Sequence, residues 1–529
     1  MKFTHATPYA SRRSPVFARN VVATSQPLAA QAGLSMLARG GDAVDAALAA
    51  AIALTVVEPS GNGLGSDAFA ILWDGRELHG LNASGRSPAA WTPERFPGAR
   101  MPERGWESVT VPGAVSAWVD LSARFGRLPF ATLFEPAVDL AERGFLVAPM
   151  TAELWRRAGD LLGHQPGFAE GFLPGGRAPR AGELFVNKPI AESLRAIAES
   201  GGRAFYEGAL AERIVAFARA HDAVLTLDDL ASHRNEWCGT ISSGFGEVAL
   251  HEIPPNGQGI AACMALGILR HLPVGDHAPD SPEALHLQIE AMKLATRDVE
   301  AFVSDPRHMT DVTAEHLLDD AYLATRARLV DPRRAGDFRS GAPARGGTVY
   351  LTAADESGMM VSFIQSNYMG FGSGVVVPGT GISLQNRGCG FVTTPGHPNQ
   401  VGPKKRPFHT IIPGFLMRGS EPLMSVGVMG GPMQAQGHLQ MTLRTQLWGQ
   451  DPQTAVDAPR WRMVSGLNVA AEPALGAATL EALTALGHII TVEPPDTSFG
   501  FGGAQLIQRI PGGYVAGSDP RKDGQAVGY

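Results

Sequence analysis

Residues 346–366, GGTVYLTAADESGMMVSFIQS, form the segment from which the rest of the chain can be interpreted. Two runs rich in β-branched and aromatic residues flank the polar turn at 356–358, a pattern typical of an antiparallel hairpin. A three-residue loop at this turn sets the pairing of the two strands. Counting outward from it places Thr348 opposite Ser366, so a hydroxyl residue begins a strand directly after two glycines.

The segment before this hairpin, residues 331–345, is polar and rich in turn-forming residues, which predicts an exposed loop. A hydroxyl at such a junction can attack the preceding carbonyl and cut the chain, and glycine tolerates the twisted backbone that this requires. Cleavage between Gly347 and Thr348 would give Thr348 a free α-amine with a pKa near ~8, able to act as general base for its own hydroxyl. In isolation, Gly-Gly-Thr is far more often an ordinary strand start, so this interpretation needs further support.

The composition is that of a globular enzyme. The 529 residues are 44% hydrophobic, with a formal net charge of -7 and a pI near 6.1. This charge, without a long basic run, argues against a nucleic-acid partner. The longest apolar run, residues 46–57, is too short to cross a bilayer, and the N-terminus has no secretory signal, so we expect a cytoplasmic protein with no membrane partner. Three cysteines without CxxC spacing indicate neither a disulfide framework nor a zinc site.

Helical patterns and a glycine-rich loop precede the hairpin. The pattern predicts a helix over 27–39 and a second over 43–56, for which Asp42 is a candidate N-cap. The loop at 58–66 contains several glycines, but it lacks the Gly-Lys-Ser/Thr ending of a phosphate-binding loop. We therefore expect it to pack closely against a neighbouring backbone.

A second glycine pair lies downstream of the hairpin. Gly430 and Gly431 separate a strand predicted over 423–428 from a helix predicted over 434–446. Backbone N–H groups at such a junction can form an oxyanion hole, and glycine lets a substrate carbonyl come close. An ordinary turn would explain the same residues equally well.

Taken together, these segments resemble the γ-glutamyltranspeptidase family of N-terminal-nucleophile hydrolases over nearly the whole chain. The shared segments, in chain order, are GGDAVDAA at 40–47, the glycine loop at 61–65, VPG at 111–113, Thr348 with Gly358 ten residues later, FGSG at 371–374, Gly430-Gly431, and GSDPRKDG at 517–524. So many matches in the right order are highly specific.

The resemblance implies an α+β, four-layer αββα fold and an amidohydrolase that needs no metal or cofactor. It implies a proenzyme cut into a large chain, residues 1–347, and a small chain, residues 348–529, which stay together as one αββα unit. Thr348 would be the nucleophile, Ser366 would take the place of a threonine that contacts the new α-amine, and Gly430 and Gly431 would form the oxyanion hole.

Departures from the family pattern bear on the substrate. Where γ-glutamyl enzymes carry an arginine that clamps the α-carboxylate, alignment on Pro88 places Ser84, with Arg86 shifted by two residues. The aspartate that binds the α-amine corresponds to Gly390, and a neighbouring glutamine corresponds to Arg387. Losing the partner of a buried ammonium costs on the order of 3–5 kcal/mol, so a γ-glutamyl substrate should bind poorly.

The remaining substitutions point in the same direction. A serine pair that contacts the carboxylate is replaced by His409 and Thr410, and an asparagine near the α-amine becomes Tyr368. Asn386 lies beside Arg387 and is also assigned to the substrate site. Positive charge from Arg86, Arg387 and His409 would suit a carboxylate close to the scissile amide, on a small molecule without an amino group.

Oxamate, an amide joined directly to a carboxylate, meets this description. QSNYMGFG at 365–372 and RPFHT at 406–410 resemble the oxamate amidohydrolase branch of the family. The resemblance implies acylation of Thr348 by oxamate, release of ammonia and hydrolysis to oxalate, as a step of purine degradation.

Two alternatives stay open at this point. One keeps the enzyme class and changes the substrate to a γ-glutamyl or cephalosporin-type acyl group, which would need a roomier pocket. The other is an uncleaved homologue that serves as a binding scaffold, inert because Thr348 would have no α-amine. A homo-oligomer of the processed heterodimer is compatible with either enzyme reading.

Overall fold

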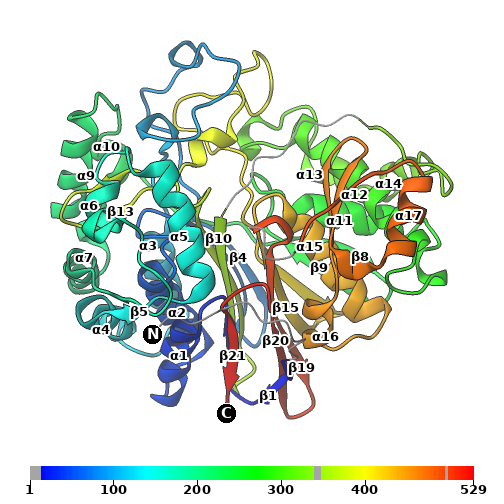
Figure 1. Ribbon diagram of the computed structural model, residues 1–529, viewed down its shortest axis with the longest axis horizontal. Helices are drawn as coiled ribbons and strands as arrows, with labels where there is room; N and C mark the ends of the chain where they lie inside the picture. Colours follow the sequence, from blue (N-terminus) through cyan, green and yellow to red (C-terminus); the bar gives the residue numbers. More distant parts are fainter. Residues whose placement is uncertain (1–12, 339–346, 495–498) are drawn as a thin grey trace.

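Two seven-stranded antiparallel sheets lie face to face between two layers of helices in the computed structural model, which describes residues 13–338, 347–494 and 499–529 (Figure 1). The first sheet contains, in spatial order, β21 Gln525–Gly528, β2 Val21–Thr24, β10 Gly347–Ala354, β11 Met360–Tyr368, β3 Asp67–Trp73, β4 Leu78–Asn82 and β7 Glu236–Trp237. The second contains β1 Val16–Ala18, β20 Gly513–Ser518, β19 Gly503–Ile510, β15 Glu421–Met429, β14 Gly414–Arg418, β9 Val248–Glu252 and β8 Ile241–Phe245.

The helices divide by chain position between the outer faces of the two sheets, on the left and right in Figure 1. The helices that share an apolar core with the outer face of the first sheet are α1 Pro27–Ala38, α2 Ala43–Val57, α3 Ala114–Phe125, α4 Glu135–Arg143, α5 Pro149–Leu162, α6 Phe168–Phe172, α7 Lys188–Ser200, α8 Arg203–Tyr206, α9 Ala209–Arg219 and α10 Leu227–Ala231. Those in the core of the second sheet's outer face are α11 Gly259–Leu269, α12 Pro282–Phe302, α13 Ala314–Leu318, α14 Asp320–Ala327, α15 Met433–Thr442, α16 Pro452–Asp457 and α17 Ala477–Ala485.

Short strands complete the structure outside the two main sheets. They are β5 Phe145–Leu146 with β6 Leu184–Phe185, β12 Val376–Val377 with β13 Ile382–Ser383, and the three-stranded group β16 Trp461–Ser465, β17 Asn468–Ala471 and β18 Ile489–Val492. Among the described residues, no helix has both the length and the apolar character needed to cross a membrane.

A third apolar cluster fills the space between the sheets. Phe69, Tyr350 and Ile364 from the first sheet meet Phe415 and Ile507 from the second. One apolar core thus lies between the two sheets, and one lies between each sheet and its helices. The layers run helix, sheet, sheet, helix, so the predicted αββα architecture is confirmed.

The first two helices begin and end close to their predicted positions. Asp42 caps α2, because its Oδ1 accepts hydrogen bonds of 3.0 Å from the amides of Val44 and Asp45, and Asp45 bonds back to the amide of Asp42. Every residue of α2 is buried. A helix that is apolar all round is stable only in such an environment, here between α1, α4 and strand β10.

The hairpin at the centre of the first sheet has the predicted register. Val349 pairs with Gln365 and Ala354 with Met360, and the turn between them closes with a 3.1 Å bond from the amide of Asp355 to the carbonyl of Met359. Gly358 has a φ of +95°, which the last position of such a three-residue loop requires. The pairing that sequence counting gave is therefore confirmed for residues 349–354 of β10.

Strands from either side of position 348 alternate within both sheets. In the first sheet β10 and β11 lie between β2 and β3, and in the second sheet β20, β19, β15 and β14 lie between β1 and β9. Each sheet therefore contains strands from both sides of the proposed cleavage point.

The contact between the sheets predicts a strong effect of a single added methyl group. A Cβ on Gly427 in β15 would overlap the ring of Tyr350, whereas a Cβ on Gly402 would meet nothing within 4 Å. We expect Gly427→Ala to lower the free energy of unfolding by about 1–3 kcal/mol, the usual cost of overpacking. Gly402→Ala is the matched control and should be nearly neutral. Denaturant unfolding measures both, and equal midpoints would contradict this packing.

Candidate active site

Thr348 lies at an irregularity at the start of strand β10. Gly347 pairs with Tyr368 and Val349 with Gln365. Between these two pairs, β11 has two residues opposite the single residue Thr348 of β10. The Thr348 hydroxyl lies 3.2 Å from the hydroxyl of Ser366, and both side chains are fully buried. The structure thus brings together the two hydroxyls that the hairpin register placed opposite each other.

The backbone after Ser366 holds its hydroxyl in place. Tyr368 donates a 2.7 Å hydrogen bond from its amide to Ser366 Oγ, and Tyr368 itself has a φ of +79°. A non-glycine residue with positive φ is uncommon and is often found at functional sites. This strained residue also contributes its ring to the neighbouring part of the site.

Gln434 is a site residue that sequence reasoning missed. Its Nε2 donates a 3.2 Å bond to the Thr348 hydroxyl, and its Oε1 accepts a 3.0 Å bond from the amide of Ile412. Gln434 lies in the first turn of α15, three residues after Gly431. Its position at the predicted strand–turn–helix junction, next to the glycine pair predicted to form the oxyanion hole, was the available signal.

The predicted glycine pair is at the end of β15. Gly430 and Gly431 have φ values of +128° and +62°, a combination that side chains would strain. The carbonyl of Gly431 accepts bonds from the amide of Gln434 at 3.1 Å and from Nε2 of Gln258 at 2.8 Å. The Gly430 carbonyl, which lies in the same peptide group as the Gly431 N–H, accepts a 3.3 Å bond from the amide of Met433 and so orients one of the two predicted oxyanion-hole donors.

The glycine-rich loop after α2 packs against the start of β10. A Cβ on Gly61 would lie 2.9 Å from the Val349 side chain and 3.2 Å from the carbonyl of Thr348. The Gly61 carbonyl also accepts a 3.1 Å bond from the amide of Asn367. The loop therefore makes the close backbone approach that its composition predicted.

Arg387 is buried beside this hairpin with much of its hydrogen-bonding capacity unused. Its side chain is 1% exposed, and Nη1 donates a 2.8 Å bond to the hydroxyl of Thr410. The guanidinium lies 4.5 Å from the centre of the Tyr368 ring. Its Nε and Nη2 have no hydrogen-bond partner among the described residues. Burial lowers the pKa of Arg387 to about 10, so the side chain is still charged at neutral pH.

His409 is neutral, which corrects the expectation that it adds positive charge. Its Nε2 lies 3.1 Å from Oδ2 of Asp67, and its Nδ1 accepts a 3.3 Å bond from the amide of Ile411. Burial, with Arg387 and Arg406 nearby, holds the pKa of His409 well below its usual range. Burial also raises the pKa of Asp67 to about 7, although Arg387 and two backbone amides favour its charged form.

Two other predicted substrate residues are engaged by the protein itself. Arg86 forms a 2.8 Å ion pair with Asp305, a partner that sequence spacing could not show. Asn386 accepts a 3.2 Å bond from the amide of Met369 and donates a 2.7 Å bond to the carbonyl of Glu103. Both side chains are thus held by contacts within the protein.

A cavity of about 410 Å³ lies against this group and is lined by Tyr368, Thr410 and Gly390. Its volume falls within the roughly 300–1,000 Å³ typical of small-molecule sites. Arg100, Glu103 and Glu300 give it charged walls of both signs. Its apolar walls include Met101, Met292, Val299, Phe391, Phe408 and Met463.

Groups that could hold a metal ion lie elsewhere in the described part of the chain. They are the buried set His286, Glu290 and His488, and the more exposed set Asp74, Glu77 and His79. Neither set includes a predicted site residue.

The profile described as Gamma-glutamyltranspeptidase matches residues 29–529. The chain belongs to this family. A glutathione hydrolase-like YwrD proenzyme of Bacillus subtilis is 36% identical over 98% of this chain and 99% of the relative. An oxamate amidohydrolase proenzyme of Klebsiella pneumoniae is 37% identical over 95% of this chain and 97% of the relative.

The solved structures agree with this membership of the γ-glutamyltranspeptidase family. The crystal structure of a cephalosporin acylase from Bacillus halodurans has a TM-score of 0.95 and 46% sequence identity, covering 100% of this chain and 99% of the other. The protein thus has the N-terminal-nucleophile hydrolase fold and is an enzyme of the family's hydrolase or acylase type.

The contact between Gln434 and the Thr348 hydroxyl can be tested on self-cleavage before Thr348. Gln434→Met removes the donor and should slow cleavage roughly tenfold, the effect typical of one lost buried hydrogen bond. Gln440→Met is the matched control, because Gln440 lies on the same helix and bonds the carbonyl of Trp461 instead. Time courses by intact mass measure both, and equal rates would remove Gln434 from the site.

Proposed function

We propose that this protein is a self-processing amidohydrolase that acts on a carboxylate-bearing amide through an ester with Thr348. In processing, the Thr348 hydroxyl attacks the Gly347 carbonyl, the peptide bond becomes an ester, and water hydrolyses it. The products are a carboxylate on Gly347 and a free α-amine on Thr348. Proenzyme relatives and the two facing hydroxyls support this step.

In turnover the Thr348 oxygen is again the nucleophile, and the α-amine freed by processing acts as the base. The α-amine of Thr348 takes the hydroxyl proton while the oxygen attacks the substrate amide, and the proton then passes to the departing ammonia or amine. Water hydrolyses the acyl ester and restores Thr348. Ser366 and Gln434 orient the hydroxyl, and the amides of Gly430 and Gly431 stabilise the oxyanion.

The observation that carries the substrate class is the partly unpaired guanidinium of Arg387. A buried cation with unsatisfied N–H groups is costly and needs an explanation, and an incoming anion supplies one. The Arg387 fork suits a carboxylate in a bidentate pair. Thr410, which already accepts from Arg387, can donate its own hydroxyl proton to the same anion.

A γ-glutamyl substrate fits less well, because position 390 has no room for an amine-binding side chain. A Cβ on Gly390 would overlap the carbonyl of Phe408. The nearby carboxylate of Asp67 is occupied by His409 and by the amides of Gly85 and Gly113. The α-ammonium of a γ-glutamyl group would therefore lack the partner it needs at this position.

Oxamate is the first candidate substrate. It presents a carboxylate directly next to the amide carbonyl and has no amino group, so Arg387 can bind the carboxylate while Thr348 attacks the amide. The reaction would release ammonia and then oxalate. The oxamate amidohydrolase proenzyme among the relatives supports this candidate.

A cephalosporin-type acylase is the second candidate, and the cavity favours it. A space of about 410 Å³ with apolar walls exceeds what oxamate needs and would accept a bulky acyl or amine portion. The cephalosporin acylase structure with 46% identity supports the same reading. Both candidates keep the carboxylate on Arg387, and they differ in what fills the cavity.

Intact mass and product release test the proposed activity. We expect fragments of residues 1–347 and 348–529, cleavage retained in Thr348→Ser and lost in Thr348→Ala. Ammonia release from oxamate supports the first candidate. Cleavage of glutaryl p-nitroanilide supports the second, and γ-glutamyl p-nitroanilide, which differs by its α-amine, should react poorly.

An uncut, inactive wild type would instead favour a binding scaffold, and self-cleavage of the Thr348→Ala variant would reject Thr348 as the nucleophile.

Paired substrates test the role of Arg387. The wild type should prefer oxamate over oxamide, its neutral analogue, and Arg387→Met should lose most of that preference, with kcat/KM for oxamate falling roughly a hundredfold, the usual cost of losing a charge-assisted pair. Arg86→Met is the matched control and should change the preference little, because Arg86 is paired with Asp305. If Arg86→Met has the larger effect, the carboxylate binds there instead.

A further inference from the structure

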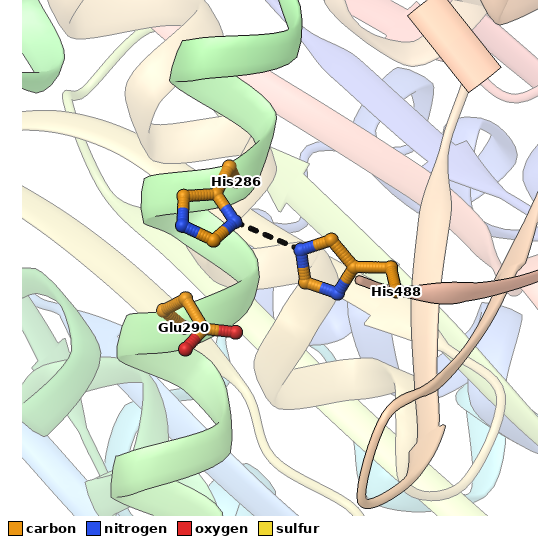
Figure 2. A group of neighbouring side chains, drawn as sticks. All are labelled: His286, Glu290 and His488. Atoms are coloured by element: carbon orange, nitrogen blue, oxygen red, sulfur yellow. Dashed lines mark hydrogen bonds between the residues drawn. The ribbon is translucent and has the colours of Figure 1, made fainter. Parts of the chain in front are cut away.

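A buried group of titratable side chains lies between α12 and the turn before β18, away from Thr348. His286 and Glu290 come from α12, and His488 precedes β18 (Figure 2). None of the three is more than 2% exposed. His286 Nδ1 and His488 Nε2 are 2.9 Å apart, joined by the dashed line in Figure 2.

The neighbours of this pair define a chain of hydrogen bonds with one direction. Lys293 can only donate, and its Nζ lies 3.4 Å from His488 Nδ1. His488 must then carry its proton on Nε2 and donate it to His286 Nδ1. His286 in turn carries its proton on Nε2 and donates a 2.8 Å bond to the carbonyl of Asp331. The tautomers are assigned from these partners.

The same side chains hold the segment 331–337. Glu290 accepts a 2.8 Å bond from the amide of Gly336, and Lys293 donates a 3.1 Å bond to the Gly336 carbonyl. From the other side, the amide of Ala335 donates a 2.7 Å bond to the carbonyl of Leu486. The segment is thus fixed at several backbone groups between α12 and the 486–488 turn.

This segment leads directly to the proposed cleavage site. Residues 339–346 lie outside the described part of the chain, and Gly347 begins β10. The fixed segment thus lies within about ten residues of the proposed cleavage site in the chain, and the covalent distance from Phe338 to Gly347 is at most about 30 Å. Lys293 and His286 belong to the proposed large chain, and His488 belongs to the small chain.

We propose that Lys293, His488 and His286 are positioning residues for self-cleavage: their hydrogen-bond chain holds the segment 331–337 in place before cleavage and fastens it to the small chain afterwards. This inference rests on the proposed cleavage between Gly347 and Thr348. It assigns a function to a polar cluster that takes no part in the chemistry at Thr348.

A metal site is the competing reading of the same residues, and the contacts argue against it. The two imidazole nitrogens that would bind an ion already bond each other, and Glu290 is bonded to Lys293 and Gly336. An ion would sit beside the Lys293 ammonium. Burial, Lys293 and His286 also lower the pKa of His488 to about 3, so the ring is neutral at pH 7, as the hydrogen-bond chain requires.

Two substitutions of one residue separate positioning from packing. A glutamine amide nitrogen can replace His Nε2, so His286→Gln keeps the donor to the Asp331 carbonyl. An asparagine amide reaches only the Nδ1 position, so His286→Asn loses it. We expect roughly tenfold slower self-cleavage in His286→Asn, with most of the rate restored in His286→Gln, the difference made by one buried hydrogen bond.

The time courses use full-length precursor and intact mass, with His271→Gln as the matched control because His271 pairs with Asp320 outside this cluster. In the uncut Thr348→Ala background, hydrogen exchange at the amides of Ala335 and Gly336 should be faster in His286→Asn than in His286→Gln. This local readout distinguishes loss of the tether from a general loss of stability, which thermal unfolding reports.

Each outcome decides between defined readings. Slower cleavage and faster exchange in His286→Asn, with rescue in His286→Gln, supports the proposal. Equal cleavage rates in both variants and the wild type overturn it while leaving self-cleavage intact. Cleavage of Thr348→Ala would overturn the proposed function itself. Zinc or nickel ions that raise the unfolding temperature of the wild type but not of His286→Asn or His488→Asn would replace the proposal with a metal site.

Discussion

The pairing of β10 with β11 is the constraint on which the candidate site depends. Even-numbered residues of β10 face the second sheet: Tyr350 packs in the cluster between the sheets, and Thr352 bonds Ser425 of β15. Odd-numbered residues such as Val349 and Leu351 face the helices. A slip by one residue would exchange the two faces and turn Thr348 away from Ser366 and Gln434. The apolar groups on both faces make that slip costly.

Sequence reasoning reached the parts of this arrangement that are local in the chain. The three-residue turn fixed the hairpin register, Asp42 marked the start of α2, and two glycines marked the junction after β15. Each of these signals acts over a few residues, where turn chemistry, capping and backbone freedom decide the structure. The family resemblance extended them to the whole fold.

The contacts that sequence reasoning missed join residues far apart in the chain. Gln434 meets Thr348 across 86 positions, and Arg86 meets Asp305 across 219. The charge of His409 was misjudged for the same reason, because its neutrality comes from burial beside Arg387 and Arg406. Such properties depend on how the layers pack, and no spacing rule within one segment contains them.

Of the three side chains predicted to bring positive charge to the site, only Arg387 is both charged and partly without hydrogen-bond partners among the described residues. With His409 neutral and Arg86 paired to Asp305, Arg387 is the cation that we propose for the substrate carboxylate. The Arg387 guanidinium is already held against the Tyr368 ring before an anion binds. It therefore needs little reorganisation on binding, and this lowers the entropic cost of binding. The cavity beside it adds selectivity by shape, since its walls are mainly apolar and its charged groups carry both signs.

Because strands from the two sides of position 348 alternate in the sheets, the two fragments of a cleaved molecule should stay together for as long as the molecule is folded. If the backbone is cut there, neither piece can leave without the loss of ladder bonds in both sheets at once. Exchange of fragments between molecules would then be as slow as global unfolding. Each mature enzyme would keep for its whole lifetime the two pieces with which it was synthesised, and damage to one piece could not be repaired by substitution with a fresh copy.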